Sequence, residues 1–122
     1  SYDLYLRFKD FDGVGQKKAS VGVNVLSRDM GLKLKDKKGI DVSYDTHIQR
    51  VFTRTGLSEA NEMNEIVNIA RELNPDYPGI LDSPCWHIGR NFCHPQKPKC
   101  HMCPLGSACG KIGIINWPKI IN

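Results

Sequence analysis

Four cysteines stand close together near the end of the chain, at Cys93, Cys100, Cys103 and Cys109. Their spacing is C-x6-C-x2-C-x5-C, so one short polar loop carries all four thiols. Thiolate is a soft ligand, and four thiolates suit either an iron–sulfur cluster or a tetrahedral zinc ion. A zinc ribbon has two C-x2-C pairs separated by a long gap, whereas this stretch has one such pair. We therefore expect a metal centre to hold the loop, the alternative being two disulfides in a secreted domain.

A glycine-containing turn at Gly13, Val14 and Gly15 is the second feature with a chemical interpretation. Two glycines let the backbone approach a ligand closely. The helix expected from Gln16 would offer unpaired N–H groups and a partial positive charge to an anion. A phosphate bound in this way would position DNA without any reading of its bases.

Three stretches together resemble the endonuclease III family of DNA glycosylases, in the helix-hairpin-helix superfamily. The cysteine spacing and residues 88–93 resemble the family's iron–sulfur loop, which opens with G-R-x-x-C. Residues 11–19 resemble L-P-G-V-G-x-K-x-A, and residues 42–51 resemble V-D-T-H-I-x-R-V. The resemblance covers residues 3–111 and corresponds to the later half of a typical family member. We therefore expect the chain to be part of a longer protein.

This resemblance implies two catalytic residues. Lys17 stands where the family's bifunctional members keep a nucleophilic lysine, whose amine attacks the sugar C1′ and forms a Schiff base. Asp45 corresponds to the family's essential aspartate, whose carboxylate would stabilise positive charge on the sugar and assist proton transfer. From the residues alone, Lys17 is equally a solvated surface charge and Asp45 a plain helix N-cap. The interval between the two is longer than expected for the family.

The resemblance also implies a cofactor and a set of DNA contacts. One [4Fe–4S] cluster would be bound by Cys93, Cys100, Cys103 and Cys109. The expected contacts with the DNA backbone are Gly13, Val14, Gly15, Lys18, Arg50, Lys97 and Lys99. Arg50 and Arg54 share a helix face and either meet phosphates or stay solvated, while His47 is expected to pack or to form a hydrogen bond. Asp12 replaces the family's proline and should weaken the contact at the turn.

The elements that must position these groups are expected to be helices, and we predict an all-α fold. Residues 1–28 should form a helix-hairpin-helix unit, with a short first helix and a buried second helix that is apolar nearly all round. Residues 29–44 should form a basic, solvated insertion loop that has room for a short hairpin.

Three further helices are expected in the helical region at residues 45–92. The first begins at Asp45 and closes at Gly56, the second is capped by Ser58 and ends at Pro75, and the third runs from Asp82. Residues 93–109 form the cluster loop. The apolar tail at residues 110–122 should pack on the domain or contact another chain.

Composition sets the general class. The chain has 122 residues, 40% hydrophobic and 25% charged, which is ordinary for one small globular domain. No apolar run approaches the roughly 20 residues of a membrane helix, and no signal peptide opens the sequence. The cysteines then favour a reducing compartment, and we expect a cytoplasmic, nucleoid-associated protein if the source is prokaryotic. The net charge of +4 permits a polyanionic partner. Cys85 should be a small buried hydrophobe.

These features predict base-excision DNA repair, as a DNA glycosylase with abasic-site lyase activity. The substrate would be double-stranded DNA with a damaged base, flipped out of the duplex, or an abasic site. The chain alone is expected to be incomplete for catalysis. The alternatives are a non-catalytic DNA-binding module of the same fold and a zinc-stabilised interaction domain. Without the earlier half, apolar faces of residues 16–28 would be exposed, and a homodimer could cover them.

Overall fold

The computed structural model describes residues 1–114. The described part of the chain contains helices and no β-strand, which confirms the predicted all-α fold. None of its helices is long and apolar enough to cross a membrane. The elements are α1 Tyr2–Lys9, α2 Gln16–Arg28, α3 Thr46–Thr55, α4 Met63–Leu73, the 3-10 helix η1 Pro78–Leu81 and α5 Asp82–Asn91.

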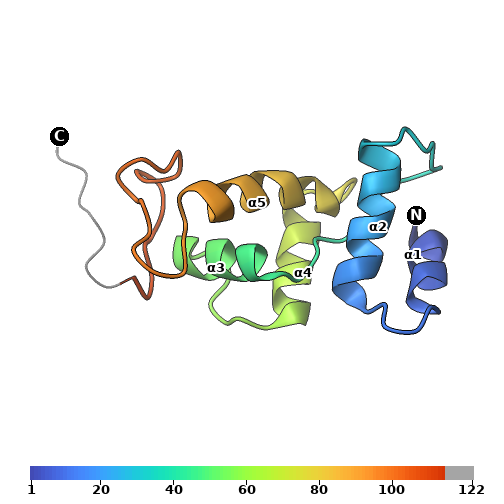
Figure 1. Cartoon of the computed structure of the whole chain (residues 1–122), viewed down its shortest axis with the longest axis horizontal. Helices are drawn as coiled ribbons and strands as arrows, with labels where there is room; N and C mark the ends of the chain where they lie inside the picture. The colour runs from blue at the N-terminus through green and yellow to red at the C-terminus, as the bar shows by residue number, and fades with distance from the viewer. Residues whose placement is uncertain (115–122) are drawn as a thin grey trace.

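Helices α1 and α2 pack side by side at one end of the molecule, and the cysteine loop lies at the other end (Figure 1). The Phe8 ring lies against α2, where it would be 3.5 Å from a Cβ at Gly22. Between the helices, Val14 N–H donates to the Phe11 carbonyl at 3.2 Å. Gly13 has φ 77°, which only glycine adopts at little cost, so the turn requires a glycine there.

The buried face of α2 is smaller and more polar than we expected. Val21 is 39% exposed, so the helix is not apolar all round. Asn24 is buried and donates from Nδ2 to the Gly79 carbonyl at 2.9 Å, while the Tyr77 hydroxyl donates to its Oδ1. The residues of α2 that are buried are Ala19, Ser20, Val23, Asn24 and Ser27.

The expectation of a wholly solvated loop at residues 29–44 is wrong for its last part. Ile40 and Val42 are 1% and 0% exposed, and the Ile40 carbonyl accepts a hydrogen bond from Gly79 N–H at 2.7 Å. Asp41 forms a two-bond ion pair with Arg71 of α4, with both N–O distances at 2.8 Å. The loop does not form a hairpin. The backbone groups of its buried part form hydrogen bonds with η1 and with side chains of α2 and α5 instead.

The core lies between α3, α4 and α5, with the segment before α3 adding Val42. Helices α3 and α5 approach closely at Gly89, which is buried and would place a Cβ 2.5 Å from His47 Nδ1. His47 is half-buried in this contact and also meets the Trp86 ring edge-on. This bears out the expectation that His47 packs.

Helix boundaries follow local capping chemistry. Asp45 caps α3 by accepting a hydrogen bond from Ile48 N–H at 2.8 Å, and Gly56 ends the helix with φ 88°. The prediction that Ser58 caps the next helix is wrong. Helix α4 begins at Met63, capped by Glu62, and the Ser58 hydroxyl instead donates to the Ala60 carbonyl at 2.6 Å.

Candidate functional site

The first turn of α2 is held against the backbone that leads into α3. Gln16 donates from Nε2 to the Val42 carbonyl at 2.8 Å and accepts from Tyr44 N–H at 2.9 Å through Oε1. Lys17 and Asp45 are the residues that follow Gln16 and Tyr44. The starts of α2 and α3 are therefore neighbours, although the residues are far apart in sequence.

Lys17 and Asp45 line two different hollows. Lys17 lines an open one with Gly13, Gly15, Lys18, Tyr44 and Met63. Asp45 lines the other, together with Val21, Asn24 and Arg28 of α2. Lys17 precedes Val21 by four residues and Asn24 by seven, so helical spacing places all three on one face of α2. The ammonium and the carboxylate are thus on neighbouring parts of the surface, and within the described residues they form no ion pair.

The Asp45 hollow contains a second carboxylate, Asp82, at the start of α5. Asp82 accepts hydrogen bonds from Ser43 N–H at 2.9 Å and from Asn24 Nδ2 at 3.3 Å. Burial raises the pKa of Asp82 to about 6; the two hydrogen bonds oppose this shift, and the charge of Asp45 adds to it. Asp82 was not among the predicted site residues.

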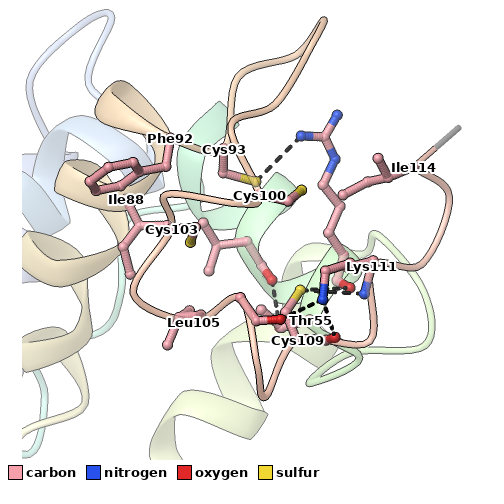
Figure 2. Close-up of a pocket in the computed structure, with 13 residues that line it drawn as sticks. Thr55, Ile88, Phe92, Cys93, Cys100, Cys103, Leu105, Cys109, Lys111 and Ile114 are labelled. Atoms are coloured by element: carbon pink, nitrogen blue, oxygen red, sulfur yellow. Dashed lines mark hydrogen bonds between the residues drawn. The ribbon is translucent and has the colours of Figure 1, made fainter. Parts of the chain in front are cut away.

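At the other end of the molecule, the four loop cysteines line one pocket (Figure 2). Its wall is apolar on the α5 side, where Ile88 and Phe92 lie, and Leu105 and Ile114 complete it. The tail contributes Ile114, whereas Ile115, Trp117, Ile120 and Ile121 lie outside the described residues.

All five cysteines are free thiols, so the disulfide alternative is not what the structure adopts. Burial raises the pKa of the Cys100 and Cys103 thiols, and the neighbouring cysteines add to it. Among residues 1–114, no three His, Cys, Asp or Glu side chains are placed to hold a single metal ion. Cys85 does not line the pocket of the other four. It is buried, as expected for a cysteine that packs as a small hydrophobic residue, and burial raises the pKa of its thiol to about 12.

The two arginines of α3 hold the cysteine loop. Arg50 donates to the Cys93 carbonyl at 3.0 Å, to His47 Nδ1 at 2.9 Å and to the Gly89 carbonyl at 3.4 Å. Arg54 donates to Cys93 Sγ at 3.3 Å and to the His94 carbonyl at 2.7 Å. We expected Arg50 to meet DNA phosphates. The structure instead directs its Nε and Nη2 groups into the protein, because the loop carbonyls there need donors.

The predicted lysine contacts are exposed at opposite ends of the molecule. Lys97 and Lys99 lie on the arm between the first two cysteines, and both are exposed. The arm is tied back by Lys99 N–H, which donates to the Phe92 carbonyl at 2.7 Å. Lys18 is exposed beside the turn at residues 11–15, and its ammonium donates to the Gly13 carbonyl at 3.2 Å. Figure 1 places α3 and α5 between the cysteine loop and this turn.

Sequence reasoning missed Gln16 and Asp82, which position the segment before α3. Both act on backbone N–H groups distant in sequence, and such contacts leave no local motif. No signal in the sequence pointed to them, because residues 29–44 were expected to be solvated and only the structure shows that residues 40–43 are buried.

Residues 1–114 are helical and place a four-cysteine loop against α3 and α5. Several known proteins are similar to this chain in sequence. Endonuclease III of Rickettsia conorii is 30% identical over 99 residues, which are 80% of this chain and 42% of that protein. Endonuclease III of Bacillus subtilis is 31% identical over 101 residues, 80% of this chain and 41% of that protein. An adenine DNA glycosylase of Mus musculus is 31% identical over 71 residues, 53% of this chain and 14% of that protein.

No family model matches the chain, and no solved structure matches it. The chain spans about two fifths of the length of the endonuclease III proteins that it matches. Over that part it is an endonuclease III-like sequence, and the resemblance found from its motifs is confirmed.

Proposed function

We propose that the chain is the later part of a base-excision DNA repair enzyme, a DNA glycosylase with abasic-site lyase activity. The observation that carries the proposal is the pair of bonds from Gln16, which holds the starts of α2 and α3 together. They bring Lys17 and Asp45 to neighbouring parts of one surface. The matches to proteins named endonuclease III and adenine DNA glycosylase support the same class of function.

Lys17 would act as the nucleophile. Its unprotonated amine attacks C1′ of the damaged nucleotide, the N-glycosidic bond breaks, and the base leaves with its electron pair and takes up a proton. The C1′–O4′ bond then breaks and opens the sugar ring, the ring oxygen takes up a proton from the amine, and a Schiff base between Lys17 and C1′ remains. This Schiff base permits loss of a C2′ proton and departure of the 3′ phosphate. Water then hydrolyses the Schiff base and returns the amine. The exposed position of Lys17 on the first turn of α2 leaves its amine accessible to a nucleotide.

Asp45 would stabilise the positive charge that develops on the sugar. Its Oδ1 already accepts from Ile48 N–H at the start of α3, which fixes the orientation of the carboxylate. A carboxylate held in this way stabilises a growing cation without the cost of reorienting. Its other oxygen is then available for a proton from the amine or from the sugar.

The DNA backbone would meet two separate parts of the surface. The turn at Gly13, Val14 and Gly15 precedes the N-terminus of α2, which favours a phosphate, and Lys18 is exposed beside it. Lys97 and Lys99 would contact phosphates at the opposite end of the molecule. Because the two regions are far apart, they would contact different stretches of one duplex.

A [4Fe–4S] cluster would be held by Cys93, Cys100, Cys103 and Cys109. The fit rests on four free thiols that line one partly apolar pocket. Donors are in place for charged sulfur: Arg54 for Cys93, and Lys111 N–H for Cys109 at 3.3 Å. When bound, the cluster would supply a rigid cross-link for the loop. The arm that bears Lys97 and Lys99 would then be fixed.

Covalent trapping tests the proposed reaction. The intact protein, of which this chain is the proposed later part, is incubated with duplex DNA containing an abasic site, and borohydride is added to reduce any Schiff base to a stable amine. We expect a DNA adduct that Lys17→Ala abolishes and Lys35→Ala, a change of an exposed lysine in the 29–44 loop, leaves intact. DNA binding without an adduct, in a preparation that includes the region preceding this chain, would favour the non-catalytic module.

A further inference from the structure

The Asp82 carboxylate accepts hydrogen bonds from two buried donors in two segments distant in sequence. Asp82 begins α5, yet its carboxylate bonds outside that helix, to Ser43 N–H at 2.9 Å and to Asn24 Nδ2 at 3.3 Å. Ser43 and Asn24 are each 2% exposed. Without Asp82 the Ser43 N–H would be buried without its acceptor, which is costly.

The Ser43 bond is the first of three that hold the backbone carrying Asp45. Tyr44 N–H donates to Gln16 Oε1 at 2.9 Å, and Asp45 N–H donates to the Ser43 carbonyl at 2.8 Å. Three successive N–H groups are therefore bound. A shift at Ser43 would move Asp45 directly, because only one residue separates them.

Asp82 and Asp45 also face the same hollow. Arg28 from the end of α2 lines it, as do Trp86 and His87 of α5. The other titratable groups near Asp82 are Tyr77 and Cys85. Burial raises the pKa of Asp82 to about 6, and the charge of Asp45 adds to the increase. Asp82 therefore adds a negative charge to this hollow as pH rises through about 6, beside the positive charge of Arg28.

We propose that Asp82 is a positioning residue for Asp45. It holds the Ser43 backbone through a hydrogen bond, and its carboxylate changes the charge of the hollow that Asp45 lines. The catalytic half of this proposal rests on the proposed function. An ionised Asp82 accepts both donors, whereas a protonated one must release or weaken one of them. Two carboxylates near the sugar stabilise a developing cation better than one.

The structural half is tested without any activity, by NMR of the 122-residue protein. Asp82→Ala should lower the exchange protection of the Ser43 amide by about tenfold or more, the effect of losing a buried hydrogen bond. Asp82→Asn retains an acceptor oxygen and should keep most of that protection. Asp45→Asn should lower the titration midpoint of Asp82 from about 6, because it removes the nearby negative charge.

The catalytic half is tested by trapping rates on abasic DNA between pH 5 and about 8, a range that brackets the Asp82 transition. The ratio of the wild-type rate to the Asp82→Asn rate should be several-fold above pH 6 and fall towards one below it. Asp76→Asn, a change of an exposed carboxylate before η1, should give a ratio near one throughout.

Three results would overturn the proposal. They are unchanged exchange protection of the Ser43 amide in Asp82→Ala, a titration midpoint of Asp82 that is the same in Asp45→Asn as in the wild type, and a ratio of trapping rates that does not vary with pH. A wild-type protein that forms no adduct would instead count against the proposed function. The exchange and titration data would still decide whether Asp82 positions the Asp45 segment.

Discussion

The side chain of Gln16 forms hydrogen bonds on both sides of Ser43, accepting from Tyr44 N–H and donating to the Val42 carbonyl. Lys17 and Asp45 each follow one of the joined residues. A single amide side chain thus sets the backbone separation of the two proposed catalytic groups. This explains how a long interval between them is compatible with a shared surface.

Gln16→Ala should destabilise the protein by about 1–3 kcal/mol, because Tyr44 N–H and the Val42 carbonyl lose their partner. Urea denaturation followed by circular dichroism measures this change. Gln96→Ala alters an exposed glutamine of the cysteine loop and should stay within about 0.5 kcal/mol of the wild type. Equal effects of the two substitutions would mean that Gln16 is not holding the segment.

Two glycine substitutions should change the free energy of unfolding in opposite directions. Gly89→Ala places a Cβ 2.5 Å from His47 Nδ1, so α3 and α5 must separate, at a cost of about 1–3 kcal/mol or more. Gly22→Ala meets Phe8 at an ordinary 3.5 Å and should stabilise α2 by up to about 1 kcal/mol. Thermal unfolding of both variants checks the pair, and a destabilised Gly22→Ala would refute the packing described for α1 and α2.

The cysteines should divide into four ligands and one packing residue. Cys93→Ala should lose bound iron, the visible absorbance of an iron–sulfur centre and much of the stability of the loop. Cys85→Ala removes a buried thiol that does not line the pocket of the four loop cysteines and should retain iron. Metal analysis of the two purified variants makes the comparison, and a wild-type protein that contains one zinc and no iron would contradict the cluster.

Asp82 should give the stability of the protein a pH dependence. Its pKa is about 6 in the folded state and near 4 when unfolded, so the folded state binds the proton more tightly. Its stabilising contribution is fully present below pH 4 and is lost as pH rises through 6, an effect of about 3 kcal/mol. Asp82→Asn should lack this decline. Denaturant midpoints of both proteins from pH 4 to about 7.5 test the sign, and parallel curves would refute it.

The arm lysines should contribute to the salt dependence of DNA binding. Replacing Lys97 and Lys99 with alanine should reduce the slope of log affinity against log salt by up to about two, for two lost phosphate contacts. The double change Lys33→Ala with Lys35→Ala removes the same charge from the exposed loop after α2 and should leave the slope unchanged. Fluorescence anisotropy with labelled duplex DNA measures both.

Patterns local in sequence predicted much of this structure. The Asp45 cap and Gly56 correctly indicated both ends of α3, since each depends on neighbours within one turn. The prediction from Ser58 was wrong because a serine is a common N-cap residue, but no helix begins directly after it. Glu62, four residues later, supplies two side-chain bonds to the first turn of α4.

The contacts that position the candidate site were not predictable in the same way. Asp82 and Gln16 reach backbone donors 39 and 28 residues away. Ile40 and Val42 are buried although they follow a lysine-rich loop, because Gly79 and Gln16 satisfy their carbonyls. Such arrangements arise only when the helices pack, and the sequence carries no spacing rule for them.

Mapping the borohydride-trapped DNA adduct to a residue by peptide mass spectrometry tests the central claim most directly. The account predicts that the modification is on Lys17 and that Asp45→Asn reduces its yield without moving it. An adduct on Lys18 or on another lysine, with Lys17 unmodified, would contradict the assignment of the nucleophile.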